Sequence, residues 1–377
     1  MDSIIAKASP FEDHRRHLDA LAAGHRTRVL APRGGRDFSS NDYLGLAGDP
    51  ALAEAVRAAI ERGVSLGSGG SRLLRGNHPE HAALEAEAAT FFGNEAALYF
   101  SSGYAANSAL LSTLPQRGDL IVHDALIHAS AHEGMRLGRA DAMAAAHNDV
   151  DAFADAIAGW RRGGGIGTVW LAAESLYSMD GDRAPLGDLA ALAERHDAVL
   201  LIDEAHATGV FGNRGRGLTA ALPRRDNLIT LHTCGKALGC EGALVTGPAV
   251  MRDFLVNRGR GFIFSTAPSP LMAAAVRASL QIVAAADDRR ARLAALVAQA
   301  HELLVPLGAA ATGSQILPVI LGDEARTMAR AARLQAAGFD VRGIRPPTIP
   351  EGTSRLRVSL TLNVDGADIE ALAEALA

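Results

Sequence analysis

Lys236 lies in the segment TLHTCGKALG, among small, apolar and glycine residues, and is one of only two lysines in the 377-residue chain. A lysine amine is a nucleophile only when neutral, and its ordinary pKa is about 10.4. Burial in an apolar niche lowers the pKa of a lysine and makes a Schiff base with an aldehyde feasible. The alternative is a lysine on a loop whose charged end stays in water. Arginine, which supplies most positive charge here, stays protonated and cannot form this bond.

Asp203, in LIDEAHATG, follows an apolar run directly. A partly buried carboxylate needs a cationic partner. A protonated pyridine nitrogen is one such partner, and pyridoxal phosphate requires it to act as an electron sink. The alternative is an aspartate that caps the next helix. His206 follows three residues later, close enough to act on the same ligand, or else serves as a hydrogen-bonded structural histidine.

The segment SSGYAAN (101–107) consists of small residues and opens a helix-like stretch. Backbone N–H groups and the helix dipole at such a turn favour an anion such as phosphate. Many turns between a strand and a helix have this composition, so the pattern favours an anion site without proving one.

Three histidines, His123, His128 and His132, lie in VHDALIHASAHEG. His128 and His132 are four residues apart, as two zinc ligands on one helix face would be. The order H-E-x-x-H is absent and no cysteine pair accompanies them, so we expect no metal. Stacking of one imidazole on an aromatic ligand is the better functional interpretation, and surface histidines are the alternative.

The segment SRLRVSL alternates with period two, which indicates a strand. Arg355 and Arg357 share one face, and either could bind a substrate carboxylate through two parallel hydrogen bonds. The alternative is a solvated polar face.

These residues require elements that bring them together. From about Pro50 to Gly239, helix-like stretches alternate with short apolar runs, which predicts an α/β domain with a largely parallel sheet. Runs ending at Glu174, Asp203 and Lys236 predict one site along the carboxyl edge of that sheet. We expect an N-terminal arm (1–45), a large domain (46–269) and a smaller C-terminal α+β domain (270–377) that begins with one long helix over roughly 270–305.

Local signals mark several element ends. Asn77 and Glu80 predict a capping box, Pro79 lies in the first turn, and Gly93 ends that helix. RRGGGIG (161–167) precedes a strand instead of opening a helix, so we predict a loop and no phosphate cradle.

Composition excludes several classes of protein. The formal net charge is −5, with 48% hydrophobic and 21% charged residues, so no basic surface for nucleic acid or an anionic membrane is expected. The two cysteines do not suggest a disulfide scaffold. The N-terminus lacks an apolar signal-peptide region, and no apolar run is long enough to span a bilayer. We therefore expect a cytoplasmic enzyme without a membrane or nucleic-acid partner.

Together these segments resemble the α-oxoamine synthases, pyridoxal-phosphate enzymes of the fold type I aminotransferase class. The resemblance covers nearly the whole chain and is carried, in order, by NDYLGL (41–46), GSGGSR (67–72), SSGYAAN, HASAHEG, ESLYSMDGD (174–182), DEAHATG (203–209), HTCGK and RLRVSL. Motifs in this order are far more specific than any one of them alone.

The resemblance implies three catalytic residues and pyridoxal 5'-phosphate as cofactor. Lys236 would form the Schiff base and later remove the substrate Cα proton. Asp203 would pair with the pyridine nitrogen, and His128 would stack on the ring.

The resemblance also assigns the remaining cofactor contacts. Ser178 and His206 would contact the phenolic oxygen of the ring or its surroundings. The turn at Gly103 and Tyr104 would bind cofactor, and Thr233 would reach the phosphate. Ser265 and Thr266 would bind the phosphate of a neighbouring subunit, since the sites of this family lie at a homodimer interface.

Four residues are expected to bind substrate. Arg357 would bind the amino-acid carboxylate, Thr348 would touch substrate, and Asn41 would lie near the reacting centre. Arg26 would meet the acyl substrate, with Arg28 as the alternative because this segment aligns poorly.

Within the family, IRPPTIPEGTSRLR (344–357) and AHNDV (146–150) look most like the member that joins L-alanine to pimeloyl-CoA or pimeloyl-acyl carrier protein in biotin synthesis. The near alternative is a member that uses glycine, such as 2-amino-3-oxobutyrate CoA ligase or 5-aminolevulinate synthase. Phe264 stands where relatives often carry tyrosine, which puts a hydroxyl role there in doubt. A non-catalytic nucleotide-binding module is the distant alternative, and the lack of a strand–G-x-G-x-x-G–helix unit counts against it.

Overall fold

A computed structural model describes residues 9–377, which form two compact units. The large unit comprises Ser40–Ala295 with Thr361–Asn363, and the small unit comprises the described residues up to Ser39 with Leu296–Leu360 and Val364–Ala377. Residues 1–8 of the predicted arm lie outside the described part of the chain. The predicted division into an arm, a large domain and a small domain stays a prediction. None of the described helices is long and apolar enough to cross a membrane.

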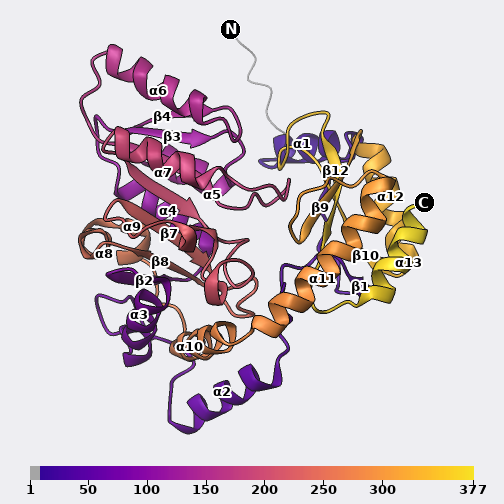
Figure 1. Ribbon diagram of the computed structural model, residues 1–377, viewed down its shortest axis with the longest axis horizontal. Coiled ribbons are helices and arrows are strands. Elements are labelled where there is room, and N and C mark those ends of the chain that lie inside the picture. The colour runs from indigo at the N-terminus through magenta and orange to yellow at the C-terminus, as the bar shows by residue number, and fades with distance from the viewer. Residues whose placement is uncertain (1–8) are drawn as a thin grey trace. The chain divides into compact units, whose positions relative to one another are not determined.

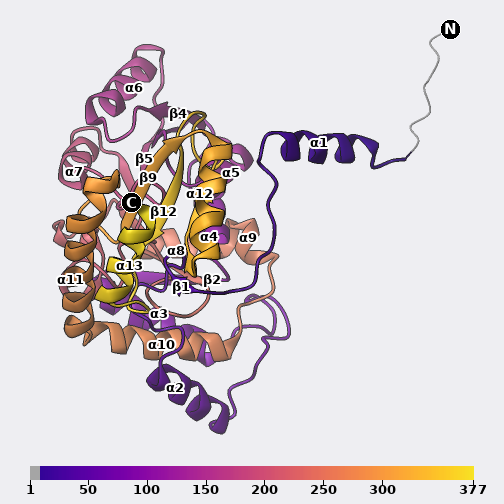
Figure 2. The same ribbon diagram turned by 90° about the vertical axis from the view of Figure 1, so that its right-hand side faces the viewer.

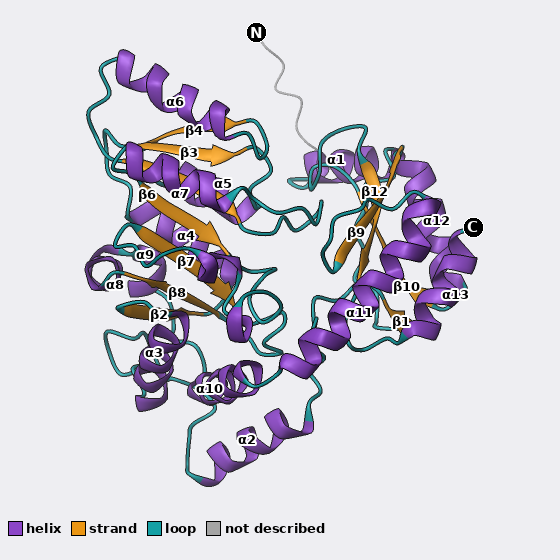
Figure 3. Cartoon of the chain, viewed as in Figure 1, coloured by secondary structure: helices purple, strands orange, loops and turns teal. Residues whose placement is uncertain are grey.

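The large unit is built on a seven-stranded sheet with the order β2-β8-β7-β6-β5-β3-β4 (Figure 3). Strand β8 runs antiparallel to both of its neighbours, and the other neighbouring pairs are parallel. The predicted α/β fold with a largely parallel sheet is therefore confirmed. The strands are β2 (Ala96–Phe100), β3 (Leu120–Asp124), β4 (Asp141–Ala145), β5 (Val169–Glu174), β6 (Val199–Asp203), β7 (Leu228–Thr233) and β8 (Ala243–Gly247).

Helices cover both faces of this sheet (Figure 1). Alternating strand residues belong to two separate hydrophobic cores. On β3, Leu120 and Val122 join one core while Ile121 joins the other. Burial on both faces explains why the central strands read as continuous apolar runs. The helices are α2 (Pro50–Glu61), α3 (Pro79–Phe92), α4 (Gly103–Thr113), α5 (Ala129–Leu137), α6 (Val150–Arg162), α7 (Leu186–Arg195), α8 (Ala249–Arg258), α9 (Arg260–Ile263), α10 (Pro270–Ala284) and the first part of α11 (Asp287–Leu304).

Helix α3 begins one residue later than predicted. His78, not Asn77, is its N-cap: His78 Nδ1 accepts from the Glu80 N–H at 3.2 Å, and His81 Nδ1 accepts from the His78 N–H at 3.1 Å. The two imidazoles perform the reciprocal capping that Asn77 and Glu80 were expected to perform. The helix ends as predicted, with Gly93 in the left-handed conformation at φ 76°.

The single helix predicted over 270–305 is wrong, because the structure has two helices, α10 and α11. Asp287 and Asp288 occupy the first turn of α11, where negative charge is favourable. Arg290 donates to the last-turn carbonyl of Val283 at 2.7 Å and also pairs with Asp287. Side-chain capping by charged residues thus ends one helix and starts the next without glycine or proline.

The small unit contains a three-stranded antiparallel sheet, β11-β12-β9, and a two-stranded parallel pair, β1-β10. Helix α12 packs against the three-stranded sheet (Figure 2). The strand predicted over SRLRVSL is present as β12. The elements are α1 (Glu12–Ala23), β1 (Arg36–Asp37), β9 (Ile316–Gly322), α12 (Glu324–Ala336), β10 (Phe339–Asp340), β11 (Arg342–Ile344), β12 (Ser354–Ser359), α13 (Gly366–Leu376) and the remainder of α11.

Candidate active site

The site of the large unit lies where its parallel strands end. Glu174 of β5 and Asp203 of β6 are register partners, and β7 runs beside β6 to end at Thr233. The carboxyl ends of parallel strands meet at one edge of a sheet, where open α/β sheets bind ligands. The parallel register therefore brings together residues that lie 59 positions apart along the chain, from Glu174 to Thr233.

Lys236 lies in the turn after β7, and its Nζ is 2.9 Å from His206 Nε2. His206 follows β6 and is buried, and its other ring nitrogen lies 2.6 Å from the Tyr43 hydroxyl. Tyr43 in turn donates to Asn41 Oδ1 at 3.0 Å. Three predicted site residues thus belong to one hydrogen-bonded chain.

The directions of these hydrogen bonds follow from the donors present. The Tyr43 hydroxyl has one hydrogen, which goes to Asn41, so His206 Nδ1 must donate to Tyr43. His206 Nε2 then carries a lone pair and accepts from the Lys236 amine. The chain of contacts assigns one tautomer to His206 and points one N–H of Lys236 at it.

Asp203 is buried at the end of β6, where each of its oxygens accepts one hydrogen bond. Oδ1 accepts from the Ala205 N–H at 2.9 Å, and Oδ2 accepts from Asn107 Nδ2 at 2.7 Å. Asn107 also donates to Ser130 Oγ at 3.0 Å, and Ser130 Oγ lies 2.7 Å from His128 Nδ1. Asp203 and His128 are therefore fixed by one shared network, and each carboxylate oxygen keeps a lone pair for a further donor.

His128 is the N-cap of α5, and its Nδ1 also accepts from the Ser130 N–H at 3.2 Å. The residue is solvent-exposed, yet loss of bulk water around the ring lowers its pKa, the charge of Asp203 opposes that shift, and the charge of Lys236 adds to it. A neutral ring with Nδ1 as acceptor is the form that can stack on an aromatic ligand. His132, the other half of the spacing typical of zinc, instead lies edge-on to His123 with ring centroids 5.0 Å apart.

Glu174 is fully buried beside Asp203. Burial, reinforced by the negative charge of Asp203, raises the pKa of Glu174 well above its ordinary value. Its Oε2 accepts from the Ser178 N–H at 3.2 Å, whereas its buried Oε1 has no hydrogen-bond partner among the described residues.

The N-terminus of α4 is the place where the sequence predicts an anion site, and its geometry is compatible with one. Ser102 caps the helix through the Ala105 N–H at 3.1 Å, and Gly103 begins it. A Cβ placed on Gly103 would lie 3.6 Å from Thr233 Oγ1, so the helix terminus and the end of β7 face each other across a space left by the missing side chain. Backbone N–H groups, the helix dipole and a threonine hydroxyl converge there, which suits a phosphate. Tyr104, next along α4, is exposed.

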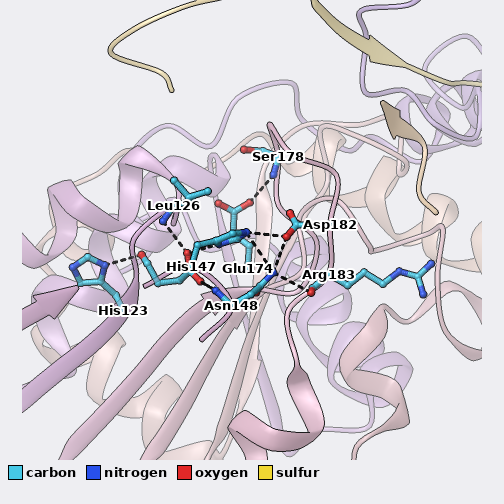
Figure 4. Close-up of polar contacts among 9 residues, drawn as sticks. His123, Leu126, His147, Asn148, Glu174, Ser178, Asp182 and Arg183 are labelled. Carbon is cyan, nitrogen blue, oxygen red and sulfur yellow. Dashed lines mark hydrogen bonds and ion pairs between the residues drawn. The ribbon is translucent and has the colours of Figure 1, made fainter. Parts of the chain in front are cut away.

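Ser178 lies in the loop after β5, which folds back on itself: the Tyr177 N–H donates to the Asp182 carbonyl at 2.9 Å. Ser178 is buried, and Asp182 contacts His147 and Asn148 from the neighbouring loop (Figure 4). Ser265 and Thr266 follow α9 and are exposed, and Thr266 pairs with Ser71 of the GSGGSR segment. The structure thus puts these two residues on the surface beside another predicted motif.

The small unit holds the remaining substrate-binding candidates. Arg26 pairs with Glu324 and Glu351 at 2.7 and 2.6 Å, whereas Arg28 donates to Thr348 Oγ1 at 3.2 Å. Arg28 is therefore the arginine that lies beside another predicted substrate residue, and Arg26 is already engaged by two carboxylates.

The polar face of β12 is not solvated. Arg355 and Arg357 are 3% and 6% exposed, because β12 is the central strand of its sheet. Arg357 donates to Ser359 Oγ at 2.6 Å. A solvated face was the alternative to a binding role, and the burial of both guanidinium groups removes it.

Sequence reasoning did not assign roles to Tyr43, Asn107, Ser130 or Glu174. Each belongs to a quoted motif or strand end. Tyr43 and Asn107 have partners far away in sequence, His206 at 163 residues and Asp203 at 96 residues. The only available signal was membership of those motifs.

The residues present fit pyridoxal phosphate. The large unit supplies an amine, a buried carboxylate, a neutral imidazole and a helix terminus with a threonine hydroxyl, all on one sheet edge. The orphaned Glu174 Oε1 and the space beside Gly103 are further features that a polar cofactor would use. Among residues 9–377, no three His, Cys, Asp or Glu side chains are placed to hold a metal ion.

Residues 35–376 match the family model of class I and II aminotransferases, and the chain belongs to that family. The resemblance to fold type I pyridoxal-phosphate enzymes is thereby confirmed.

One sequence relative and two solved structures are similar to this chain over most of its length. The chain is 46% identical over 377 residues to the 8-amino-7-oxononanoate synthase of Anaeromyxobacter dehalogenans, with 96% of this chain and 93% of the relative covered. It resembles the structure of serine palmitoyltransferase from S. paucimobilis with a bound PLP–myriocin aldimine (TM-score 0.87, 27% identity, 97% and 96% of the two chains). It also resembles the structure of 8-amino-7-oxononanoate synthase from Francisella tularensis (TM-score 0.77, 27% identity, 91% and 96%).

Proposed function

We propose that the protein condenses L-alanine with a pimeloyl thioester, releasing CO2 and a thiol, to give 8-amino-7-oxononanoate for biotin synthesis. The observation that carries the proposal is the convergence of Lys236, Asp203 and His128 on one sheet edge, in a chain 46% identical to a synthase of that name. Pyridoxal 5'-phosphate, when bound, supplies the electron sink for the carbanion at the alanine Cα.

Each residue of the large unit has a distinct task. Asp203, oriented by Asn107, holds a proton on the cofactor ring nitrogen through its negative charge. His128 supplies a flat neutral surface. The first turn of α4 and Thr233 hold the phosphate by hydrogen bonds and the helix dipole. These groups bind and orient the cofactor before any substrate arrives.

Lys236 moves the proton. Its Nζ is held by His206, so the amine has a fixed position from which it binds the cofactor and, once released, accepts the Cα proton. Lys236 is the only lysine among the described residues, and the buried His206 beside it has a neutral acceptor nitrogen directed at Nζ.

Substrate groups are assigned to the small unit. The buried Arg357 binds the alanine carboxylate as a bidentate donor, and Thr348 touches substrate. Arg28, which donates to Thr348, is the better candidate than Arg26 for the acyl substrate. The active form is a cytoplasmic homodimer in which Ser265 and Thr266 serve the neighbouring site.

Product analysis tests the proposal. Purified protein with pyridoxal phosphate is mixed with L-alanine or glycine and with pimeloyl-CoA or pimeloyl-acyl carrier protein, and products are identified by mass spectrometry. We expect 8-amino-7-oxononanoate from alanine only, and the better donor identifies the carrier. A product formed from glycine and a short acyl-CoA, with none from alanine, would contradict the proposal.

A further inference from the structure

His147 lies just after β4, with a carboxylate at each ring nitrogen. Its Nδ1 is 2.9 Å from Asp124 Oδ1. Its Nε2 is 2.8 Å from Asp182 Oδ2 (Figure 4). A carboxylate only accepts hydrogen bonds, so both ring nitrogens must donate, and a ring with two N–H groups is an imidazolium.

The surroundings support this charge state. Burial lowers the pKa of His147, but the hydrogen bonds to Asp124 and Asp182 outweigh it and raise that pKa to about 10. Asp124 is 1% exposed; burial raises its pKa, but the His147 contact and the N–H groups of Asn148 and Leu126 hold it below its ordinary value. The Tyr177 ring packs edge-on against the imidazolium, with the two ring centroids 4.4 Å apart.

The two carboxylates belong to the loops that carry cofactor residues. Asp124 ends β3 four residues before His128, and Asp182 lies four residues after Ser178. Asn148 spans the same gap, because its N–H donates to Asp124 Oδ2 and its Nδ2 donates to Asp182 Oδ2, at 2.8 and 2.7 Å. His147 and Asn148 therefore tie three successive loops of one sheet edge together.

We propose that His147 is a positioning residue whose bridge between Asp124 and Asp182 holds the His128 and Ser178 loops in the arrangement that binds pyridoxal phosphate. This inference rests on the proposed cofactor. His147 acts on the cofactor site only through Asp124 and Asp182, so it is not a catalytic residue.

Loss of the imidazolium would change the forces between the loops. Two carboxylates would then face each other across the vacated position, and like charges in a partly buried site repel. Asn148 would remain as a neutral link, so the fold is retained while the two loops lose their fixed spacing. The cofactor, which needs both loops, therefore reports the change more strongly than global stability does.

Two variants and a control test the bridge. His147→Gln removes the charge and one of the two donors. Asp182→Asn removes one carboxylate at a position whose side chain is 38% exposed, so folding is not at risk. His196→Gln is the matched control, because His196 is the C-cap of α7 and lies just before the start of β6, whereas the site lies at the end of that strand.

The measurements are the pyridoxal phosphate dissociation constant of each holoenzyme by visible absorbance, the melting temperature, and kcat and KM for the thioester donor. We expect His147→Gln to weaken cofactor binding by roughly tenfold to a hundredfold, as loss of supporting residues does at metal sites. Asp182→Asn should also weaken cofactor binding. The double variant should bind pyridoxal phosphate no more weakly than His147→Gln does. The donor KM and the control variant should be unchanged.

Cofactor affinity equal to wild type in Asp182→Asn and in His147→Gln would overturn the bridge, as would a loss of melting temperature alone. If His147→Gln fails to fold, Asp182→Asn decides the question by itself. A wild-type protein that binds no pyridoxal phosphate would instead refute the proposed function, and the inference with it.

Discussion

At the residue scale, the position of the Lys236 amine is fixed by His206 and, through it, by Tyr43. The Tyr43 hydroxyl accepts from His206 Nδ1, which leaves Nε2 as the acceptor for Lys236. A neutral imidazole can exchange its tautomers, so the hydroxyl is what keeps the acceptor nitrogen on the lysine side. Tyr43 thus influences the reacting amine without touching it.

Lys236→Ala should abolish both visible cofactor absorbance of the bound form and trapping by borohydride. The reason is that no other lysine is present among residues 9–377. The check is reduction with borohydride followed by mass spectrometry of the protein. A variant that remains yellow and becomes covalently labelled at another residue would contradict the assignment of Lys236.

Tyr43→Phe should lower kcat severalfold and destabilise the protein by about 1 kcal/mol, the usual net value of one hydrogen bond. The His206 tautomer is then no longer imposed. Steady-state kinetics and denaturant unfolding measure the two effects. Tyr99→Phe is the control, because its hydroxyl donates to the Glu241 carbonyl at 2.7 Å on the edge strand β2. Equal kcat losses in both variants would speak against the role of Tyr43.

The charge on His147 also predicts a pH dependence of stability. Its folded pKa is raised to about 10, above the ordinary value of about 6.5. The stabilisation is therefore fully present below about pH 6.5 and is lost as the pH rises through about 10. The groups facing the ring are Asp124 and Asp182 and the Tyr177 phenol, whose pKa burial raises, so the phenol stays neutral.

The difference in melting temperature between wild type and His147→Gln should accordingly shrink as the pH rises from neutrality toward 10. Thermal unfolding at a series of pH values measures it. A difference that stays constant, or grows with pH, would contradict an imidazolium at this position.

At the element scale, the first turn of α4 serves two purposes, because it is both a capped helix end and an anion site. Gly103→Ala should leave stability unchanged or slightly higher, since alanine favours helices over glycine by up to about 1 kcal/mol. Cofactor affinity should fall roughly tenfold, equivalent to 1.4 kcal/mol, because the new Cβ fills the space beside Thr233.

Gly187→Ala is the matched control for this change. Gly187 lies in the first turn of α7, and a Cβ there would meet no atom within 4 Å. Pyridoxal phosphate titration and thermal unfolding of both variants distinguish the effect of alanine on helix stability from the effect of a Cβ that fills the space between Gly103 and Thr233. Undiminished cofactor affinity in Gly103→Ala would argue against a phosphate at α4.

At the scale of the whole molecule, the predicted homodimer has a surface that suits it. A groove of about 700 Å³ in the large unit is lined by Tyr104, Leu137, Phe254 and Phe264, all of them exposed, and Phe264 precedes Ser265 and Thr266 directly. Exposed apolar side chains gathered around one groove are typical of an interface. In a dimer in which the partner subunit covers Phe264, Ser265 and Thr266 would lie at the partner's cofactor site.

Phe264→Glu should therefore shift the protein from dimer to monomer and weaken cofactor binding in parallel. Light scattering and absorbance measure the two effects. Ile166→Glu, at a position 93% exposed in the loop before β5, is the control. A wild-type monomer with full activity would exclude a shared site.

The sequence by itself determined the periodic features: which runs become buried strands and which residues stand at strand ends. Those features depend on neighbours within a few positions, which local pattern encodes. Lys236 and Asp203 could be singled out for this reason, and arginine could be excluded as a substitute for the lysine.

Only the tertiary structure decided which distant residues meet. The contact of Tyr43 with His206, the bridge of His147 between Asp124 and Asp182, and the burial of Arg357 in a central strand depend on strand order and register. The break between α10 and α11 likewise depends on where Arg290 can reach. Packing selects these partners from many chemically equivalent residues, and a periodic pattern carries no information about which one is chosen.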